Sequence, residues 1–151
     1  MIVGRYGAVL NVAAMAATAI SLLGCAGDRA RLREERINTF PDNYRTDLLG
    51  AMHAYVADPS NIRDAYLSEP VLRQIGAQNR YTVCLRFNAK DSDGRYVGSR
   101  DAMAIFVSGR FDQFVDLSQQ SGQQATAAEQ AKEACAQADY KRFPELEALK
   151  R

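Results

Sequence analysis

Apolar residues recur along this chain with two different periods, and each period predicts one kind of secondary structure. In residues 43–57 large apolar side chains return every three or four positions, at Tyr44, Leu48, Met52 and Tyr55. This is the spacing of one helix face. Pro41-Asp42-Asn43 before it and Asp58-Pro59 after it are start and stop signals. We therefore predict an amphipathic helix over 43–57.

Alternation with period two marks the middle of the chain as β-structure. In residues 80–88 one face carries large apolar side chains, namely Tyr81, Val83, Leu85 and Phe87. Residues 102–107 are apolar on both faces, which is typical of a central strand. A third strand follows at 111–117, and turn residues at 90–94 and 108–109 separate the three. Such consecutive strands predict an antiparallel meander.

Residues 61–74 fit two structures. Ile62, Tyr66 and Leu67 could lie on one face of a second helix, but Pro70 would break that helix. On an edge strand the proline is tolerated, because its missing N–H can face solvent. We favour the strand.

The last helix is predicted from a capping box and a face of small residues. Thr126 and Glu129 form the T-x-x-E pattern of a helix start. One face then carries Ala127, Ala131, Ala134, Cys135 and Ala138, ending near Asp139, and Pro144 opens a short terminal turn. The predicted fold is α+β: an N-terminal amphipathic helix, an antiparallel meander of three or four strands, and a C-terminal helix packed on the sheet.

The first 24 residues have the pattern of an export signal. Arg5 precedes the apolar run 8–23, which is shorter than the roughly 20 residues that a spanning helix needs. The run ends in Leu22-Leu23-Gly24-Cys25, which resembles the lipobox of bacterial lipoproteins. The resemblance implies diacylglycerol on Cys25 and cleavage before it by signal peptidase II. An ordinary signal peptide, or a helix that happens to end in cysteine, are the alternatives.

The resemblance also implies a location. The residue after Cys25 is Ala26 and not aspartate, which in the sorting rule of enteric bacteria implies the inner leaflet of the outer membrane, facing the periplasm. We expect three parts: a signal peptide at 1–24, a lipidated tether at 25–41, and a single α+β domain at 42–151. The tether is charged, and we favour a solvated linker over a contact with lipid headgroups.

Charge and cysteine count narrow the partners and the compartment. The chain has 19 basic and 18 acidic residues, so it lacks the basic excess of a nucleic-acid-binding protein. It has three cysteines. With Cys25 used for lipid, Cys84 and Cys135 remain, and an exported chain favours a disulfide between them. Two free thiols or an intermolecular bridge are the alternatives.

Candidate catalytic chemistry is sparse. His53 is the single histidine, which excludes a two-histidine metal site. We expect it to be half-buried and structural. The segment Asp91–Gly94 is similar to a calcium loop, but Ala89 and Arg100 would then occupy ligand positions. A hairpin turn explains it better, and we predict no cofactor.

Arginine is frequent in the sheet region. Arg86 and Asn88 share the strand face opposite Tyr81 and Phe87, and Tyr96 lies across the following turn. We interpret Arg86, Asn88 and Tyr96 as a candidate surface for an anionic or peptide partner, since arginine and tyrosine are enriched at interfaces. The alternative is a solvated face with ion pairs to Asp101, Asp112 and Asp116.

A family resemblance rests on three short motifs. Asp58-Pro59-Ser60, V-C-L-R-F-N-A-K at 83–90 and G-R-Y-V-G at 94–98 resemble small lipoproteins and exported proteins of alphaproteobacteria. This resemblance implies an envelope location and no particular activity. If 61–76 were helical, the topology alone would be similar to outer-membrane assembly lipoproteins of the SmpA/OmlA type.

We therefore expect a non-catalytic envelope lipoprotein that acts as a structural or protein-interaction module, held to the membrane at Cys25. It would have an envelope protein as partner and no nucleic acid. The alternative is a small periplasmic ligand-binding protein or enzyme that uses His53 or the arginine-rich sheet face.

Overall fold

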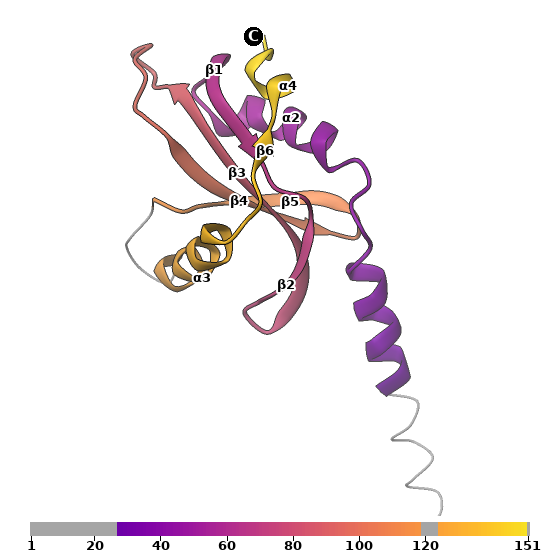
Figure 1. The fold of residues 1–151 in the computed structure, drawn as a ribbon. Helices are drawn as coiled ribbons and strands as arrows, with labels where there is room; N and C mark the ends of the chain where they lie inside the picture. The colour runs from indigo at the N-terminus through magenta and orange to yellow at the C-terminus, as the bar shows by residue number, and fades with distance from the viewer. Residues whose placement is uncertain (1–26, 119–123, 151) are drawn as a thin grey trace, which may run out of the picture. The chain divides into compact units, whose positions relative to one another are not determined.

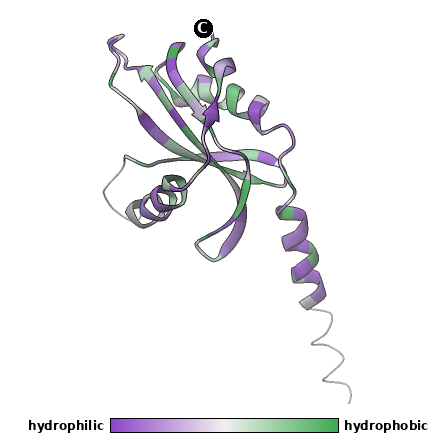
Figure 2. Cartoon of the chain, in the orientation of Figure 1, coloured by the Kyte–Doolittle hydropathy of each residue, from purple (hydrophilic) through white to green (hydrophobic). Residues whose placement is uncertain are grey.

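The computed structural model describes residues 27–118 and 124–150. The predicted signal peptide and Cys25 lie outside the described residues. The chain divides into two compact units, Met1–Arg36 and Ile37–Arg151. Residues 27–37 form a helix, mostly hydrophilic (Figure 2), whose side chains are exposed as far as residue 36. Among the described helices, none combines the length and the hydropathy that crossing a membrane requires.

Residues 37–41, predicted as the end of the tether, belong to the second unit. The carbonyl oxygen of Ile37 accepts a hydrogen bond of 2.8 Å from the Ser108 N–H, and the Phe40 ring packs edge-on against Tyr81. Ser108 and Gly109 form the tight turn expected there, both with positive φ. A Cβ on Gly109 would lie 3.3 Å from the Phe40 carbonyl oxygen, so glycine suits this close approach.

Helix α2, Tyr44–Tyr55, confirms the predicted amphipathic helix and ends at Tyr55 rather than at residue 57. Its apolar face, Tyr44, Leu48 and Met52, is buried. Asn43 occupies the N-cap position, but its side chain makes no capping hydrogen bond. The start signal at Pro41-Asp42-Asn43 thus marks the position of the helix start without a side-chain cap at Asn43, and the stability of this helix comes from packing of its apolar face.

In the described part of the chain, six strands form one antiparallel sheet (Figure 1). They are β1 (Asp58–Leu67), β2 (Val71–Ile75), β3 (Gln78–Lys90), β4 (Arg100–Val107), β5 (Arg110–Asp116) and β6 (Lys141–Arg142). The order is β5-β4-β3-β1-β6, and β2 also pairs with β3. The predicted α+β class is confirmed, and the sheet has more strands than the three or four predicted. A strand as short as β6 has no period that a sequence could show.

Strands β1 and β2 lie in succession along the same edge of β3. Val71 of β2 pairs with Thr82, and Leu67 of β1 pairs with Leu85. Residues 68–70 separate the two strands, and Pro70, which has no N–H to donate, falls in that gap. The strand interpretation of this region is correct and the helical alternative is wrong, so the topological analogy with SmpA/OmlA lipoproteins no longer applies.

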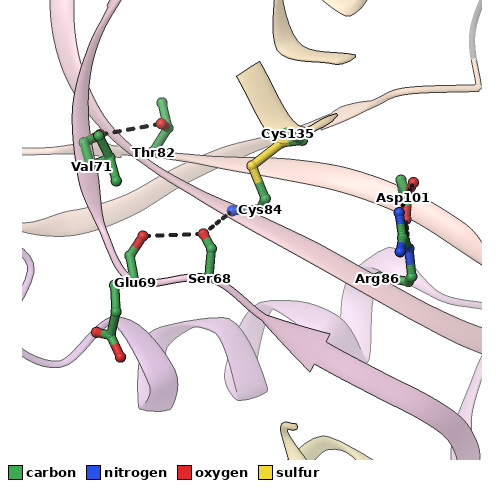
Figure 3. The surroundings of a disulfide bond; sticks show 8 residues. All are labelled: Ser68, Glu69, Val71, Thr82, Cys84, Arg86, Asp101 and Cys135. Carbon is green, nitrogen blue, oxygen red and sulfur yellow. Dashed lines mark hydrogen bonds and ion pairs between the residues drawn. A yellow bond between two sulfur atoms is a disulfide. The ribbon is translucent and has the colours of Figure 1, made fainter. Parts of the chain in front are cut away.

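Ser68 continues the hydrogen bonding to β3 in the gap between β1 and β2 (Figure 3). Its N–H donates to the Cys84 carbonyl oxygen, and the Cys84 N–H donates to Ser68 Oγ, both over 2.9 Å. The Ser68 hydroxyl donates in turn to the Glu69 carbonyl oxygen over 3.1 Å. Ser68 is 6% exposed. A side-chain oxygen thus satisfies a buried backbone donor where β1 and β2 part.

We expect Ser68→Ala to lower the free energy of unfolding by about 1–3 kcal/mol, because it leaves the buried Cys84 N–H without an acceptor. The measurement is urea unfolding followed by circular dichroism. Ser99→Ala, at an exposed position, is the control and should change stability by less than about 0.5 kcal/mol. Equal midpoints for both variants would show that the backbone relaxes to make the bond without Ser68.

Different elements of the chain pack against the two faces of the sheet. The face with Val83, Leu85 and Phe87 forms the larger core, with side chains of α2 and with Phe143 and Leu146 near the C-terminus. The opposite face forms a smaller core, which contains Cys84, Met103, Ile105, Leu117, Ala131 and Cys135. In Figure 1, α2 and α4 accordingly lie close together and α3 lies apart from both.

A disulfide joins helix α3, Gln124–Ala136, to the smaller core. The predicted Cys84–Cys135 bond is present, with the two Cα atoms 5.5 Å apart (Figure 3). The helix begins before Thr126 and ends before Asp139. The predicted capping box is therefore misplaced, because Thr126 lies within the helix.

The C-terminal residues complete the edge beside β1. Strand β6 pairs with Tyr66 and Leu67, and the Phe143 N–H donates to the Ala65 carbonyl oxygen over 2.8 Å. Pro144 opens helix α4, Pro144–Glu147, at the predicted terminal turn. Glu147 Oε1 accepts a hydrogen bond of 3.0 Å from the Ala65 N–H.

Candidate functional site

Arg86, the first residue of the predicted partner surface, is engaged in an ion pair. Its Nε and Nη2 donate to the two carboxylate oxygens of Asp101 over 2.7 and 3.0 Å (Figure 3). The hydrogen bond to Asp101 raises the pKa of Arg86. The guanidinium also lies 4.8 Å from the ring centre of Tyr140. Burial, followed by the negative charge of Asp101, raises the pKa of the Tyr140 hydroxyl.

Several other arginines of the sheet region also pair with carboxylates. Arg100 contacts Asp116 over 3.1 Å and Arg110 contacts Asp47 over 3.3 Å. The alternative to a partner surface was a solvated face with ion pairs to three aspartates. Asp101 and Asp116 do form such ion pairs, whereas Asp112 makes none with the described residues.

The Asp91–Gly94 segment is a turn, as predicted. Asp91 Oδ1 accepts hydrogen bonds from the Asp93 and Arg95 N–H groups over 3.0 and 2.9 Å. The bond from the Arg95 N–H is the main cause that lowers the pKa of Asp91. Across the part of the chain that the structure describes, no group of three acidic, histidine or cysteine side chains could hold a metal ion.

Two cations that the sequence did not single out lie against the ring of Tyr96. The Arg63 guanidinium lies 4.1 Å from its ring centre and Lys90 Nζ lies 5.5 Å from it. The Tyr96 hydroxyl donates to the Asn61 carbonyl oxygen over 2.7 Å, which fixes the ring against β1. We refer to Arg63, Tyr96 and Lys90 as the Tyr96 cluster.

Asn88 lies opposite Arg63, a member of the Tyr96 cluster, whereas Arg86 lies opposite Tyr66 and pairs with Asp101. Asn88 pairs with Arg63 in the β1–β3 register, so both side chains lie on the same face of the sheet. Asn88 Oδ1 is buried and has no hydrogen-bond partner in the described part of the chain. The structure thus brings together two of the three predicted residues, Asn88 and Tyr96, through Arg63.

The backbone of β1 is irregular where it presents Arg63. The register with β3 shifts on both sides of that residue. Asn61 and Asp64 have positive φ values of 60° and 50°, a conformation that asparagine and aspartate adopt more readily than most residues. Bulges of this kind redirect side chains. The direction of the Arg63 side chain therefore depends on how β1 pairs with β3.

An open hollow of about 430 Å³ adjoins the cluster. It is lined by Asn61, Ile62, Arg63, Lys90, Tyr96 and Glu147. Glu147 also contacts Arg142 over 3.5 Å. A second open hollow, of about 570 Å³, lies between β2 and α3, with Arg73 in its lining. Arg73 is paired directly opposite Arg80 in the β2–β3 register.

His53 lies in the last turn of α2 and is exposed. The expectation of a half-buried histidine is wrong, because the buried stripe of the helix follows Tyr44, Leu48 and Met52 and excludes the next position. It makes no hydrogen bond or ion pair with the residues described. Nothing in the structure brings His53 together with Arg86, Asn88 or Tyr96.

Comparisons of the chain with protein-family models, with curated proteins and with solved structures found no match. The function must therefore be argued from the fold, the Tyr96 cluster and the sequence motifs.

Proposed function

We propose that this protein is a non-catalytic lipoprotein of the cell envelope, anchored through lipid at Cys25 to the inner leaflet of the outer membrane. The observation that carries the proposal is Leu22-Leu23-Gly24-Cys25 at the end of an apolar run. The other two cysteines of the chain are bonded to each other. A disulfide suits an oxidising compartment, and it leaves Cys25 as the cysteine available for lipid. The resemblance to alphaproteobacterial lipoproteins points the same way.

The folded part of the chain would act as a structural or protein-interaction module. Both faces of its sheet are packed against other side chains, and a disulfide cross-links helix α3 to β3. Such a scaffold holds surface side chains in fixed positions, as binding sites require. The Tyr96 cluster offers the residue types that contribute most at interfaces, an arginine and a tyrosine. The residues from Cys25 up to the start of the folded unit at Ile37 would serve as the tether between this module and the bilayer.

The anchor is tested by Cys25→Ser. We expect the variant to lose incorporation of a fatty-acid analogue and either to leave the membrane fraction or to remain as an uncut precursor. The reason is that one sulfur carries the diacylglycerol, and stable anchoring needs two or more acyl chains. Labelling is measured per amount of protein in whole cells.

Cys135→Ser is the matched control, because it removes a different sulfur and should keep the label. Equal labelling of wild type and Cys25→Ser would contradict the proposal, and so would loss of label in Cys135→Ser alone.

A further inference from the structure

The two cations of the Tyr96 cluster form no salt bridge with a carboxylate of the described residues, although Asp58 lies opposite Lys90 in the β1–β3 register. Neighbouring cations are neutralised: Arg86 by Asp101, Arg95 by Asp93, and Arg142 by Glu147. Arg63 and Lys90 make no ion pair with the described carboxylates, and their interactions are with the Tyr96 ring.

The ring contacts orient these cations without consuming their hydrogen-bond donors. A guanidinium over an aromatic face keeps its N–H groups free at its edge, where they match a carboxylate in geometry. Because the Tyr96 hydroxyl is bonded to the Asn61 carbonyl oxygen, the ring is a fixed platform. Arg63 and Lys90 are thus positioned before any ligand arrives.

The lining of the adjoining hollow limits the charge of that ligand. Arg63, Lys90 and Glu147 leave the lining with a net positive charge of one. A carboxylate is complementary to this charge, and its two oxygens match the paired N–H donors of the Arg63 guanidinium. The Tyr96 ring adds aromatic surface to the lining, which suits a peptide segment better than a free ion.

We infer that the hollow beside Tyr96 binds a carboxylate on an acidic segment of a partner protein, held between Arg63 and Lys90. This inference rests on the proposed interaction function and names the chemistry of the partner. Arg63 supplies a bidentate donor pair, Lys90 supplies a second cation, and Tyr96 holds both in place.

The direct test measures fluorescence polarisation of a labelled, end-blocked tetra-aspartate peptide with the purified folded protein at low salt. We expect Arg63→Gln/Lys90→Gln to weaken binding about tenfold or more, since hydrogen bonds to charged groups are the strong ones. The matched control is Arg73→Gln/Arg80→Gln, which removes the same charge from a cross-strand pair elsewhere on the sheet and should stay within about twofold. Equal weakening in both double variants would reduce the effect to overall charge and overturn the inference.

Two further readouts do not depend on these variants. Added tetra-aspartate should shift the amide resonances of residues 61–63, 90 and 96 in the wild-type protein, and shifts centred elsewhere would overturn the inference. Inorganic phosphate should compete with the peptide no better than acetate does. If phosphate competed more strongly than acetate, the inference of a carboxylate ligand would be overturned in favour of a phosphate group.

Crosslinking in intact envelopes separates this inference from the proposed function. If wild type and Arg63→Gln/Lys90→Gln recover the same partner equally, the interaction function stands and the hollow is not its site. If wild-type protein recovers no partner, the interaction function itself fails. Loss of a wild-type partner in this variant, but not in Arg73→Gln/Arg80→Gln, supports both.

Discussion

Reduction of the Cys84–Cys135 disulfide is expected to lower the free energy of unfolding by about 4 kcal/mol. The two cysteines are 51 residues apart, and the chain-entropy model assigns about this much to a loop of such length. Domains of this size are stable by only about 5–15 kcal/mol. Urea unfolding with and without a phosphine reductant measures the effect, and unchanged midpoints would contradict it.

Helix α3 should be the first element released. Its buried side chains are small, namely Ala128, Ala131 and Cys135, and the core it joins is the smaller of the two. Small side chains bury little apolar area, so packing alone holds this helix weakly. The disulfide therefore supplies an unusually large share of its attachment.

Hydrogen exchange locates the effect. On reduction we expect amides of α3 to lose protection well before those of α2, which packs against the larger core through Leu48 and Met52. Simultaneous loss in both helices would show instead that the disulfide stabilises the whole unit cooperatively.

Phe87→Ala is expected to destabilise the folded unit by about 3–5 kcal/mol, the usual range for deleting a buried aromatic side chain. Phe87 is 0% exposed and lies in β3, between β1 and β4. Its ring meets Tyr55 of α2 edge-on at 6.3 Å. Removal would therefore leave a cavity where the sheet and α2 meet. Chemical denaturation measures the change.

The control for this substitution is Val97→Ala. Val97 is 55% exposed, so its truncation should change stability by less than about 0.5 kcal/mol. If Phe87→Ala also costs less than about 1 kcal/mol, the larger core can collapse around the deletion and is less tightly packed than its burial indicates.

The tyrosine that Phe87 contacts is itself strongly perturbed. Burial, followed by the negative charge of Asp116, raises the pKa of Tyr55 to about 12. Because the folded-state pKa is raised, Tyr55 opposes unfolding equally at all pH values below its ordinary value near 10. That contribution is lost as the pH rises from there through 12. The interface between α2 and the sheet is accordingly insensitive to Tyr55 ionisation at neutral pH.

Local periodicity in the sequence was enough to predict the strongly patterned elements of this protein, among them α2 and β3, and the faces they bury. The three-to-four-residue spacing from Tyr44 to Met52 predicted α2, and the alternation from Tyr81 to Phe87 predicted β3 with its two unlike faces. Cys84 lies on one of those faces and Cys135 on the alanine-lined face of α3. The disulfide could therefore be predicted from two observations together: the element faces on which the two cysteines lie, and the oxidising compartment that an exported chain reaches. These features depend on neighbours within one or two turns, which a sequence displays directly.

Only the tertiary structure decided the break in the long strand and the composition of the candidate site. Pro70 is compatible with a helix end and with a strand gap, and the hydrogen bond from the Cys84 N–H to Ser68 Oγ appears only once β3 is in register. Arg63 reaches Tyr96 from an irregular part of β1, where the register with β3 shifts, and Lys90 reaches it through an isolated bridge between Lys90 and Tyr96. Such contacts join residues that are distant in the chain, and the bulges that shift the register of β1 interrupt the local period that would otherwise indicate it.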